Sequence, residues 1–234
     1  MAAETQVLVD NEKKYIAKFF SDASESDVKK VDISTLSWAK HTITLSGAAS
    51  PNFKIGEVLT VGAEKYLVTG FTAGASTVEV VGWDNTNKKA TAIDASSSNG
   101  DAVSGGVSGN NTRTYSSIAE QDFNVLVTKI MWICNGLQVA IEWDGSGSEA
   151  YIAELIANGI WSMPAMEWPG IGINASGDSG DVLGDIQFST TGHASGDSYT
   201  VIMELKKQSG YDIPAYEQNN ILGYPVDYLL GNFT

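Results

Sequence analysis

Two histidines and one cysteine are the residues of this chain best suited to acid–base or nucleophilic chemistry. His41 lies beside a segment with strand character, and His193 lies in a loop rich in glycine and serine. Neither histidine stands in a recognisable nucleophile or metal-ligand motif. Cys134 has no basic neighbours in the sequence to lower the pKa of its thiol. The chain also lacks GxSxG, P-loop and dinucleotide-binding motifs. We therefore expect no enzyme, no catalytic residue, no metal site and no cofactor.

Carboxylates offer two further kinds of chemistry. Four glutamates could supply the paired acid and base of a glycosidase, although the sequence places no two of them across a cleft. They are Glu142, Glu149, Glu154 and Glu167. Acidic loops rich in glycine and serine also bind calcium through oxygen ligands. The candidate clusters are Asp144, Ser146, Ser148 and Glu149, and Asn174, Asp178 and Asp181. Neither cluster matches the EF-hand pattern, so we interpret both as solvated turns.

Tryptophan rings can stack on sugars, and the chain has six of them. Trp132 and Trp143 fall on a strand face that we expect to be core. Trp161 and Trp168 flank Pro164 in a segment that could be exposed, so these two are the candidates for a surface aromatic site. Core packing remains the favoured interpretation of the tryptophans as a group.

Composition limits the partners of this chain. It has 28 acidic and 14 basic residues in 234, a formal net charge of −14. This charge argues against nucleic acid or an anionic membrane as the main partner. No apolar run reaches the length of a membrane span, and the first residues lack the basic and apolar regions of a signal peptide. A single cysteine excludes an intrachain disulfide. We expect a soluble acidic protein made in the cytosol.

The clearest structural element is the stretch from Asn124 to Asp144. An apolar run over residues 125–134 is followed by Asn135-Gly136 and then by strict alternation over residues 137–143. Asn-Gly is typical of a type I′ turn, so we predict a β-hairpin. In this hairpin Cys134 lies opposite Leu137, and Lys129 lies opposite Glu142. The predicted core face consists of Thr128, Ile130, Trp132, Cys134, Leu137, Val139, Ile141 and Trp143.

The fold class that we predict is mainly β: an antiparallel, jelly-roll-like β-sandwich with an inserted small barrel. The sandwich is expected to comprise residues 1–36 and 115–210. Residues 37–114 carry four short strand candidates separated by glycine and proline, as in small SH3-like or OB-like barrels. The last part of this range, residues 90–114, is rich in Ser, Gly and Asn, and we interpret it as a long loop or linker.

The C-terminal segment, residues 211–234, differs from the rest of the chain. It has no Lys or Arg, and its prolines oppose a continuous helix. It is too apolar for a typical disordered terminus, so it packs either on its own domain or on a neighbouring subunit. Aromatic anchors favour interfaces. The candidate partner-binding residues are Tyr211, Tyr216, Ile221, Leu222, Tyr224, Tyr228 and Phe233.

Three segments carry a resemblance to a known family: TQVLVDNEKKY at residues 5–15, IMWICNGLQVAIEWD at 130–144 and TTGHASGDSYTVIMELKK at 190–207. In this order they resemble virion structural proteins of tailed bacteriophages, especially of marine and cyanobacterial phages. The resemblance covers residues 5–36 and 115–208, and its motifs are structural. It implies a virion component, a capsid decoration (cement) protein or, as the alternative, a neck or tail component.

Taken together, these features lead us to expect a non-enzymatic decoration protein on the outer face of a phage head. Its expected partners are the major capsid protein or other virion proteins and further copies of itself in a homo-oligomer, with no nucleic acid and no membrane. It would be made in the host cytoplasm and located in the virion. An acidic surface repels packaged DNA, which favours the outer face of the shell. A carbohydrate-binding β-sandwich module is a further alternative.

Overall fold

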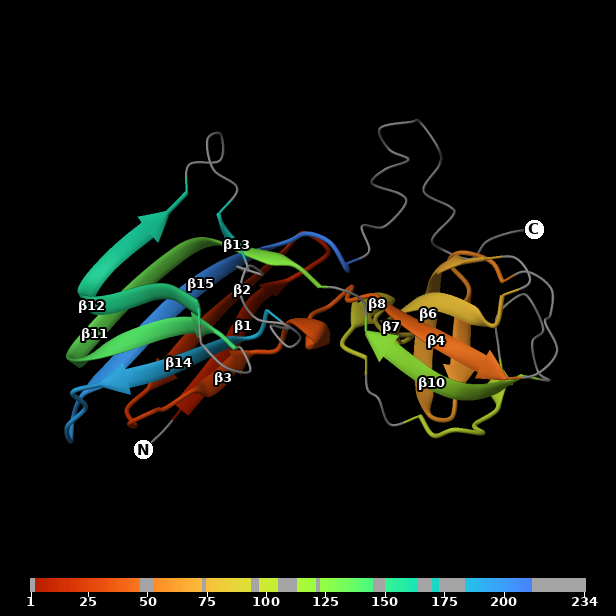
Figure 1. The fold of residues 1–234 in the computed structure, drawn as a ribbon, viewed down its shortest axis with the longest axis horizontal. Coiled ribbons are helices and arrows are strands. Elements are labelled where there is room, and N and C mark those ends of the chain that lie inside the picture. Colours follow the sequence, from red (N-terminus) through yellow and green to blue (C-terminus); the bar gives the residue numbers. More distant parts are fainter. Residues whose placement is uncertain are drawn as a thin grey trace. The chain divides into compact units, whose positions relative to one another are not determined.

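The computed structural model describes residues 3–46, 53–72, 75–93, 97–104, 113–120, 123–144, 150–163, 170–172 and 184–211. Within these ranges the chain is almost entirely β-structure, with one short 3-10 helix at Ile33–Thr35 (Figure 1). It divides into two compact units. Unit 1 comprises Met1–Ile33 and Asp122–Ser209, and unit 2 comprises Ser34–Gln121 and Gly210–Thr234. The prediction of a mainly β, antiparallel sandwich and barrel fold is confirmed.

Unit 1 contains a single antiparallel sheet of eight strands. Six strands lie in the order β1-β2-β15-β11-β14-β3. The other two, β12 and β13, also pair with β11. The strands are β1 (Ala3–Asp10), β2 (Lys14–Ser21), β3 (Val28–Val31), β11 (Val125–Trp143), β12 (Ala150–Ser162), β13 (Ile171–Gly172), β14 (Ile186–Thr191) and β15 (Ser198–Lys207).

Strand β11 is continuous through Asn135-Gly136, so the predicted hairpin is wrong. Its first half pairs with β15, up to Asn135 opposite Ser198. Its second half pairs with β14, starting from Gln138 opposite Thr191. Strand β12 follows β11 along both halves. The predicted partners Lys129 and Glu142 therefore do not meet: the neighbours of Lys129 are Glu204 and Ser162, and those of Glu142 are Tyr151 and Gln187.

At Asn135-Gly136 the whole sheet bends back over itself. Gly136 has a φ of +80°, and the neighbouring β12 has Ala157 at +55°. Strand β14 pairs with one half of β11 and β15 with the other, and the segment between Thr191 and Ser198 joins them at the same place. In Figure 1, β11 and β12 curve back over themselves at this point. The two halves then face each other, because Phe19 of β2 lies 5.2 Å from Phe188 of β14 between ring centroids. The sheet is thus a sandwich.

The predicted core face of β11 is correct in most positions, although the turn is not. Val139 and Ile141 are fully buried, and Ile130 and Trp143 are 1% exposed. Cys134 and Leu137 are both buried despite their odd spacing. A strand that curves back over itself keeps its concave side towards the core, so the change of parity between Cys134 and Leu137 comes from the backbone at the fold, where Gly136 has a φ of +80°. A hairpin demands the same change of parity, and alternation alone cannot distinguish the two.

Unit 2 contains a seven-stranded antiparallel sheet of order β10-β4-β7-β6-β5-β9, with β8 on β7. The strands are β4 (His41–Ser46), β5 (Val58–Val61), β6 (Glu64–Phe71), β7 (Thr77–Asp84), β8 (Lys89–Thr91), β9 (Val103–Ser104) and β10 (Thr114–Glu120). The two ends of this sheet approach each other: Ala102 bridges Thr114, and the Tyr115 N–H donates to the Asp101 carbonyl over 2.8 Å. The sheet is therefore nearly closed into a barrel.

Two boundaries from the sequence need correction. The sequence predicts residues 34–36 and 115–120 in the sandwich, but unit 2 begins at Ser34, and residues 115–120 form β10, which pairs with β4 in the barrel. The stretch 90–114 is more than a linker, because Val103 on β9 is fully buried among the apolar side chains of the barrel core. Short strands with one buried anchor have too little periodicity to be recognised from sequence. Residues 105–112 lie outside the described ranges.

Candidate interaction surface

The structure gives the two histidines and the cysteine ordinary structural surroundings. The His41 Nδ1 lies 3.2 Å from the Ala39 carbonyl oxygen in unit 2. The His193 Nε2 lies 3.1 Å from the Asp22 carbonyl oxygen in unit 1. Burial raises the pKa of the Cys134 thiol to about 11, so it stays protonated near neutral pH. The two imidazoles thus belong to different units, and the thiol is not activated.

A buried group of three polar side chains links the two layers of the sandwich. The Lys30 Nζ lies 2.7 Å from Glu25 Oε1, and the Tyr199 hydroxyl donates to Glu25 Oε2 over 2.6 Å. Burial, and then the neighbouring Glu25 carboxylate, raise the pKa of Tyr199. Because the hydroxyl keeps its proton, it remains a donor to Glu25. This arrangement fixes the loop before β3 against β15, which is a structural role.

Two further ion pairs involve buried groups. The Lys207 side chain is completely buried, and its Nζ lies 2.6 Å from Asp10 Oδ1. Burial lowers the pKa of Lys207, against the opposing effect of Asp10. The buried Asp185 accepts from Lys29 Nζ and from the Ile33 N–H, over 2.5 and 2.9 Å. Sequence reasoning missed these groups. Lys207 was detectable, since it continues the alternation of inward residues along β15.

The two candidate calcium clusters, interpreted above as solvated turns, fall mostly outside the described residues. Residues 145–149 and 173–183 lie outside the described ranges, and Asp144 alone remains, 3.8 Å from Lys29 Nζ. In the part of the chain that the structure describes, no group of three or more His, Cys, Asp or Glu side chains is arranged to hold a metal ion. No helix in that part is long and apolar enough to cross a membrane.

Of the predicted partner-binding residues, Tyr211 is the one that the structure describes. It is 5% exposed and bridges Ala39, beside a 2.8 Å hydrogen bond from the Lys40 N–H to the Gly210 carbonyl. A buried ring in this position anchors the start of the segment to unit 2, so any partner contact begins after it. The other candidates lie outside the described residues: Tyr216, Ile221, Leu222, Tyr224, Tyr228 and Phe233.

The two tryptophans predicted as surface aromatics differ in what can be said of them. Trp161 is half-buried and pairs with Ile130, whose side chain lies in the core. Cross-strand partners share a face of the sheet, so Trp161 lies on its core side. Trp168 falls outside the described residues. The carbohydrate-binding alternative gains no support from Trp161.

The outer face of β12, β11 and β15 carries a row of apolar side chains where a sandwich normally presents polar ones. Met131 of β11 lies between Ile160 of β12 and Ile202 of β15. Ile133 follows on the same face, beside Thr200. Ile160 and Ile133 are 66% and 63% exposed. We call these four apolar residues, Met131, Ile133, Ile160 and Ile202, the apolar row.

A shallow hollow of about 280 Å³ lies at the apolar row. Its lining is mainly apolar, and Asn158 and Thr200 supply its polar side chains. Gly159 also lines it, with the Trp132 ring lying so close that a Cβ at this position would overlap the indole. The Trp132 Nε1 donates to the Ile156 carbonyl over 3.1 Å. This volume lies just below the ~300–1,000 Å³ of small-molecule sites.

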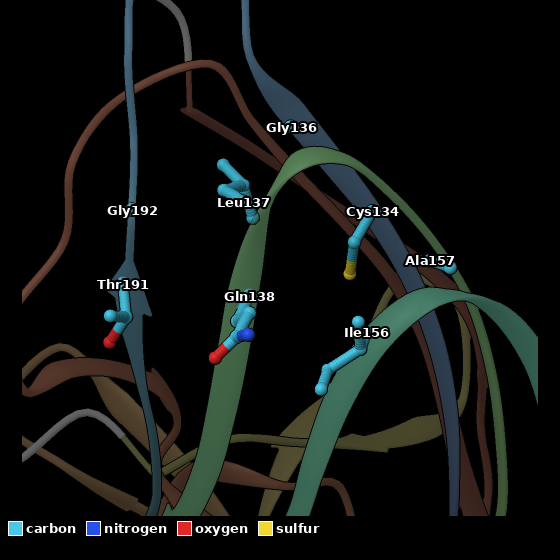
Figure 2. Close-up of a pocket in the computed structure, with 8 residues that line it drawn as sticks. All are labelled: Cys134, Gly136, Leu137, Gln138, Ile156, Ala157, Thr191 and Gly192. Carbon is cyan, nitrogen blue, oxygen red and sulfur yellow. The ribbon is translucent and has the colours of Figure 1, made fainter.

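A second hollow, of about 410 Å³, lies under the arch of β11 at the fold of the sheet. Figure 2 shows Cys134 and Leu137 on the arch, Ile156 on β12 below it and Thr191 on β14 beside it. The lining contains two polar amide or hydroxyl side chains, Gln138 and Thr191, and no acid or base. It offers shape and apolar contact rather than proton transfer.

Comparisons with known proteins do not identify a family. No protein-family model matches the chain, and no curated protein matches it. Among solved structures, the search finds one titled "Complete structure of manganese lipoxygenase of Gaeumannomyces graminis and partial structure of zonadhesin of Komagataella pastoris". The alignment has 9% identity, covers 90% of this chain and 84% of that one, and has a TM-score of 0.14. A score this low carries no argument about fold or function.

Proposed function

We propose that this chain is a non-enzymatic structural protein of a tailed-phage particle, a decoration protein on the outer face of the head. The apolar row is the observation that carries this proposal. The row is contiguous across three strands; Ile133 and Ile160 are exposed and Met131 and Ile202 are half-buried, and contiguous apolar side chains that reach solvent mark a protein-binding surface. A protein whose role is to cover and join other proteins needs such a surface. Neither of the two hollows is lined by an acid or a base, and the Cys134 thiol that lines the larger one keeps its proton near neutral pH.

Charge supports the outer side of a shell as the location. With a formal charge of −14, the protein is repelled by packaged DNA and remains soluble before assembly. The expected partners are the major capsid protein, other virion proteins and further copies of this chain. The resemblance of residues 5–36 and 115–208 to virion proteins points to the same setting.

Particle association tests the proposal. Particles of the virus that encodes this chain are banded by density, and the protein is quantified by mass spectrometry against the major shell protein. The proposal predicts that the protein bands with intact heads in a copy number that scales with the shell protein. A copy number matching a single ring would instead favour a neck or tail component. Absence from purified particles would refute a virion role.

A further inference from the structure

We propose that the apolar row binds the C-terminal segment, residues 212–234, of a second copy of this chain, so that copies are linked by exchanged segments. This inference names the partner of the surface on which the proposed function rests. It requires self-association of the chain but no particular particle.

The apolar row lies outside the core of its own sandwich. Met131, Ile160 and Ile202 adjoin across three strands, with Ile133 beside them and Phe20 of β2 next to Thr200 on the same face. Their inward neighbours already fill the core, since Ile130 and Met203 are 1% exposed. The row therefore contributes nothing to the core of its own sandwich. A partner that covers it must bring apolar side chains, spaced along an extended surface.

The C-terminal segment has that composition. Over 23 residues it supplies apolar and aromatic side chains from one end to the other. They are Ile213, Tyr216, Ile221, Leu222, Tyr224, Val226, Tyr228, Leu229, Leu230 and Phe233. A single aromatic ring suits a hollow of about 280 Å³ such as the one at the apolar row. Aromatic anchors in pockets are the usual source of binding energy in protein interfaces.

Charge complementarity selects this segment among the possible occupants. The outer face of the β1–β2–β15–β11 layer is basic although the protein as a whole is acidic. By register, four lysines lie on it against two glutamates: Lys14, Lys18, Lys129 and Lys206, with Glu4 and Glu204. The segment has three acidic residues and no basic one: Asp212, Glu217 and Asp227. Opposite charges around an apolar centre favour this pairing and its orientation.

Two copies packed face to face would be a poorer solution. Each partner would bring the same excess of lysine, and like charges across an interface are unfavourable. The segment avoids this repulsion in any register because it has no cation. Reach is not limiting, since a chain of 23 residues can span at most roughly 75–80 Å when extended.

Binding of a peptide to a shortened protein tests the inference. A fluorescein-labelled peptide of residues 212–234 is titrated into a variant that ends at Tyr211, and fluorescence anisotropy is measured. We expect saturable binding that Ile160→Asp weakens by about tenfold or more, because Ile160 is the most exposed side chain of the row and a charge there opposes an apolar contact. Lys18→Glu combined with Lys129→Glu should weaken it several-fold, and so should added salt.

Ile55→Asp is the matched control, because Ile55 is also a half-exposed isoleucine but belongs to unit 2. It should leave peptide binding unchanged. Each variant is compared with the parent by circular dichroism and thermal unfolding. Absence of peptide binding would overturn the inference, and so would equal binding by the Ile160→Asp variant.

Sedimentation shows whether the segment acts between copies. The full chain should sediment as an oligomer, whereas the shortened variant and full-length Ile160→Asp should sediment as monomers. A monomeric full chain that no longer accepts the peptide would mean docking within one copy, and would overturn the exchange. Particle association separates this inference from the proposed function. Heads that carry the protein, together with a peptide that fails to bind, would refute the exchange alone. Peptide binding without particle association would refute the virion role alone.

Discussion

The two units of this chain treat their apolar side chains differently. Among the described residues, the exposed large apolar side chains of unit 1 are Val7, Leu8, Val28, Ile133, Tyr151, Ile156 and Ile160, and unit 2 has Ile55. Unit 2 nearly closes its sheet into a barrel, which shortens its free edges and turns its apolar residues inward. Unit 1 folds one sheet over itself and leaves an apolar outer face. The barrel core is enclosed by its own strands, whereas the proposed exchange would cover the apolar row of the sandwich.

The largest effect on this comparison should come from the fold of the unit 1 sheet. Gly136→Val should lower the free energy of unfolding of unit 1 by about 3–4 kcal/mol, because Gly136 has positive φ and the Asp197 carboxylate occupies the space of a Cβ. Gly192→Ala is the control: its φ is also positive, but nothing lies within 4 Å, so strain alone should cost about 1–2 kcal/mol. Chemical denaturation measures both. Equal losses would show that the fold of the sheet tolerates a side chain at position 136.

The buried ion pair of unit 1 should have the next largest effect. Asp10→Ala leaves the completely buried Lys207 ammonium without this carboxylate and should cost about 2–3 kcal/mol, below the usual range because Asp10 is partly exposed. Asp10→Ala combined with Lys207→Met should recover most of the loss, since a methionine fills the same space without charge. If the double variant were no more stable than Asp10→Ala, the loss of stability would not come from removing the Asp10 carboxylate from the buried Lys207 ammonium.

Alkaline pH should destabilise unit 1 through Tyr15. Burial, and then the Asp10 charge, raise the pKa of Tyr15 from 10 to about 12. Between these values the unfolded chain loses the proton while the folded one keeps it. The stability contributed by the protonated hydroxyl is therefore complete below pH 10 and is lost as the pH rises towards 12. Tyr15→Phe should flatten this part of the pH profile of unfolding. An unchanged profile would show that Tyr15 is not its source.

The smallest effect should be that of the apolar row on folding. Ile160→Asp should change the free energy of unfolding of the shortened chain, residues 1–211, by no more than about 0.5 kcal/mol, because Ile160 is 66% exposed. Ile43→Asp in the barrel should unfold unit 2, because Ile43 is fully buried. A large loss from Ile160→Asp in a chain without the segment would mean that the row supports its own sandwich rather than a partner.

The sequence predicted which side of a strand is buried better than it predicted which strands lie beside each other. Alternation along β11 identified Ile130, Val139 and Ile141 as core, and the structure confirms them. It misjudged Asn135-Gly136 because a two-residue hairpin and this fold of the sheet both bury Cys134 and Leu137, at the same odd spacing. The deciding information is which strands lie beside β11, and β14 and β15 are more than forty residues away in the sequence. Non-local pairing of this kind leaves no local pattern.

Part of the candidate surface could be predicted from the sequence. Met131 and Ile133 stood on the face opposite the predicted core, where apolar residues have no partner within the chain. Their meaning depended on Ile160 and Ile202, which only the register brings beside them. The buried ion pairs are similar: Lys207 follows the inward alternation of β15, but its partner Asp10 lies at the other end of the chain.

A photo-crosslink from position 160 tests the central claim most directly. A benzophenone amino acid replaces Ile160 in the full chain, and copies labelled with ¹⁴N and ¹⁵N are mixed, allowed to exchange and irradiated. Mass spectrometry of the digest should show crosslinks between position 160 and residues 212–234 that join copies of different isotope. Crosslinks confined to copies of one isotope in the exchanged mixture, crosslinks to other parts of the chain, or none at all would contradict it.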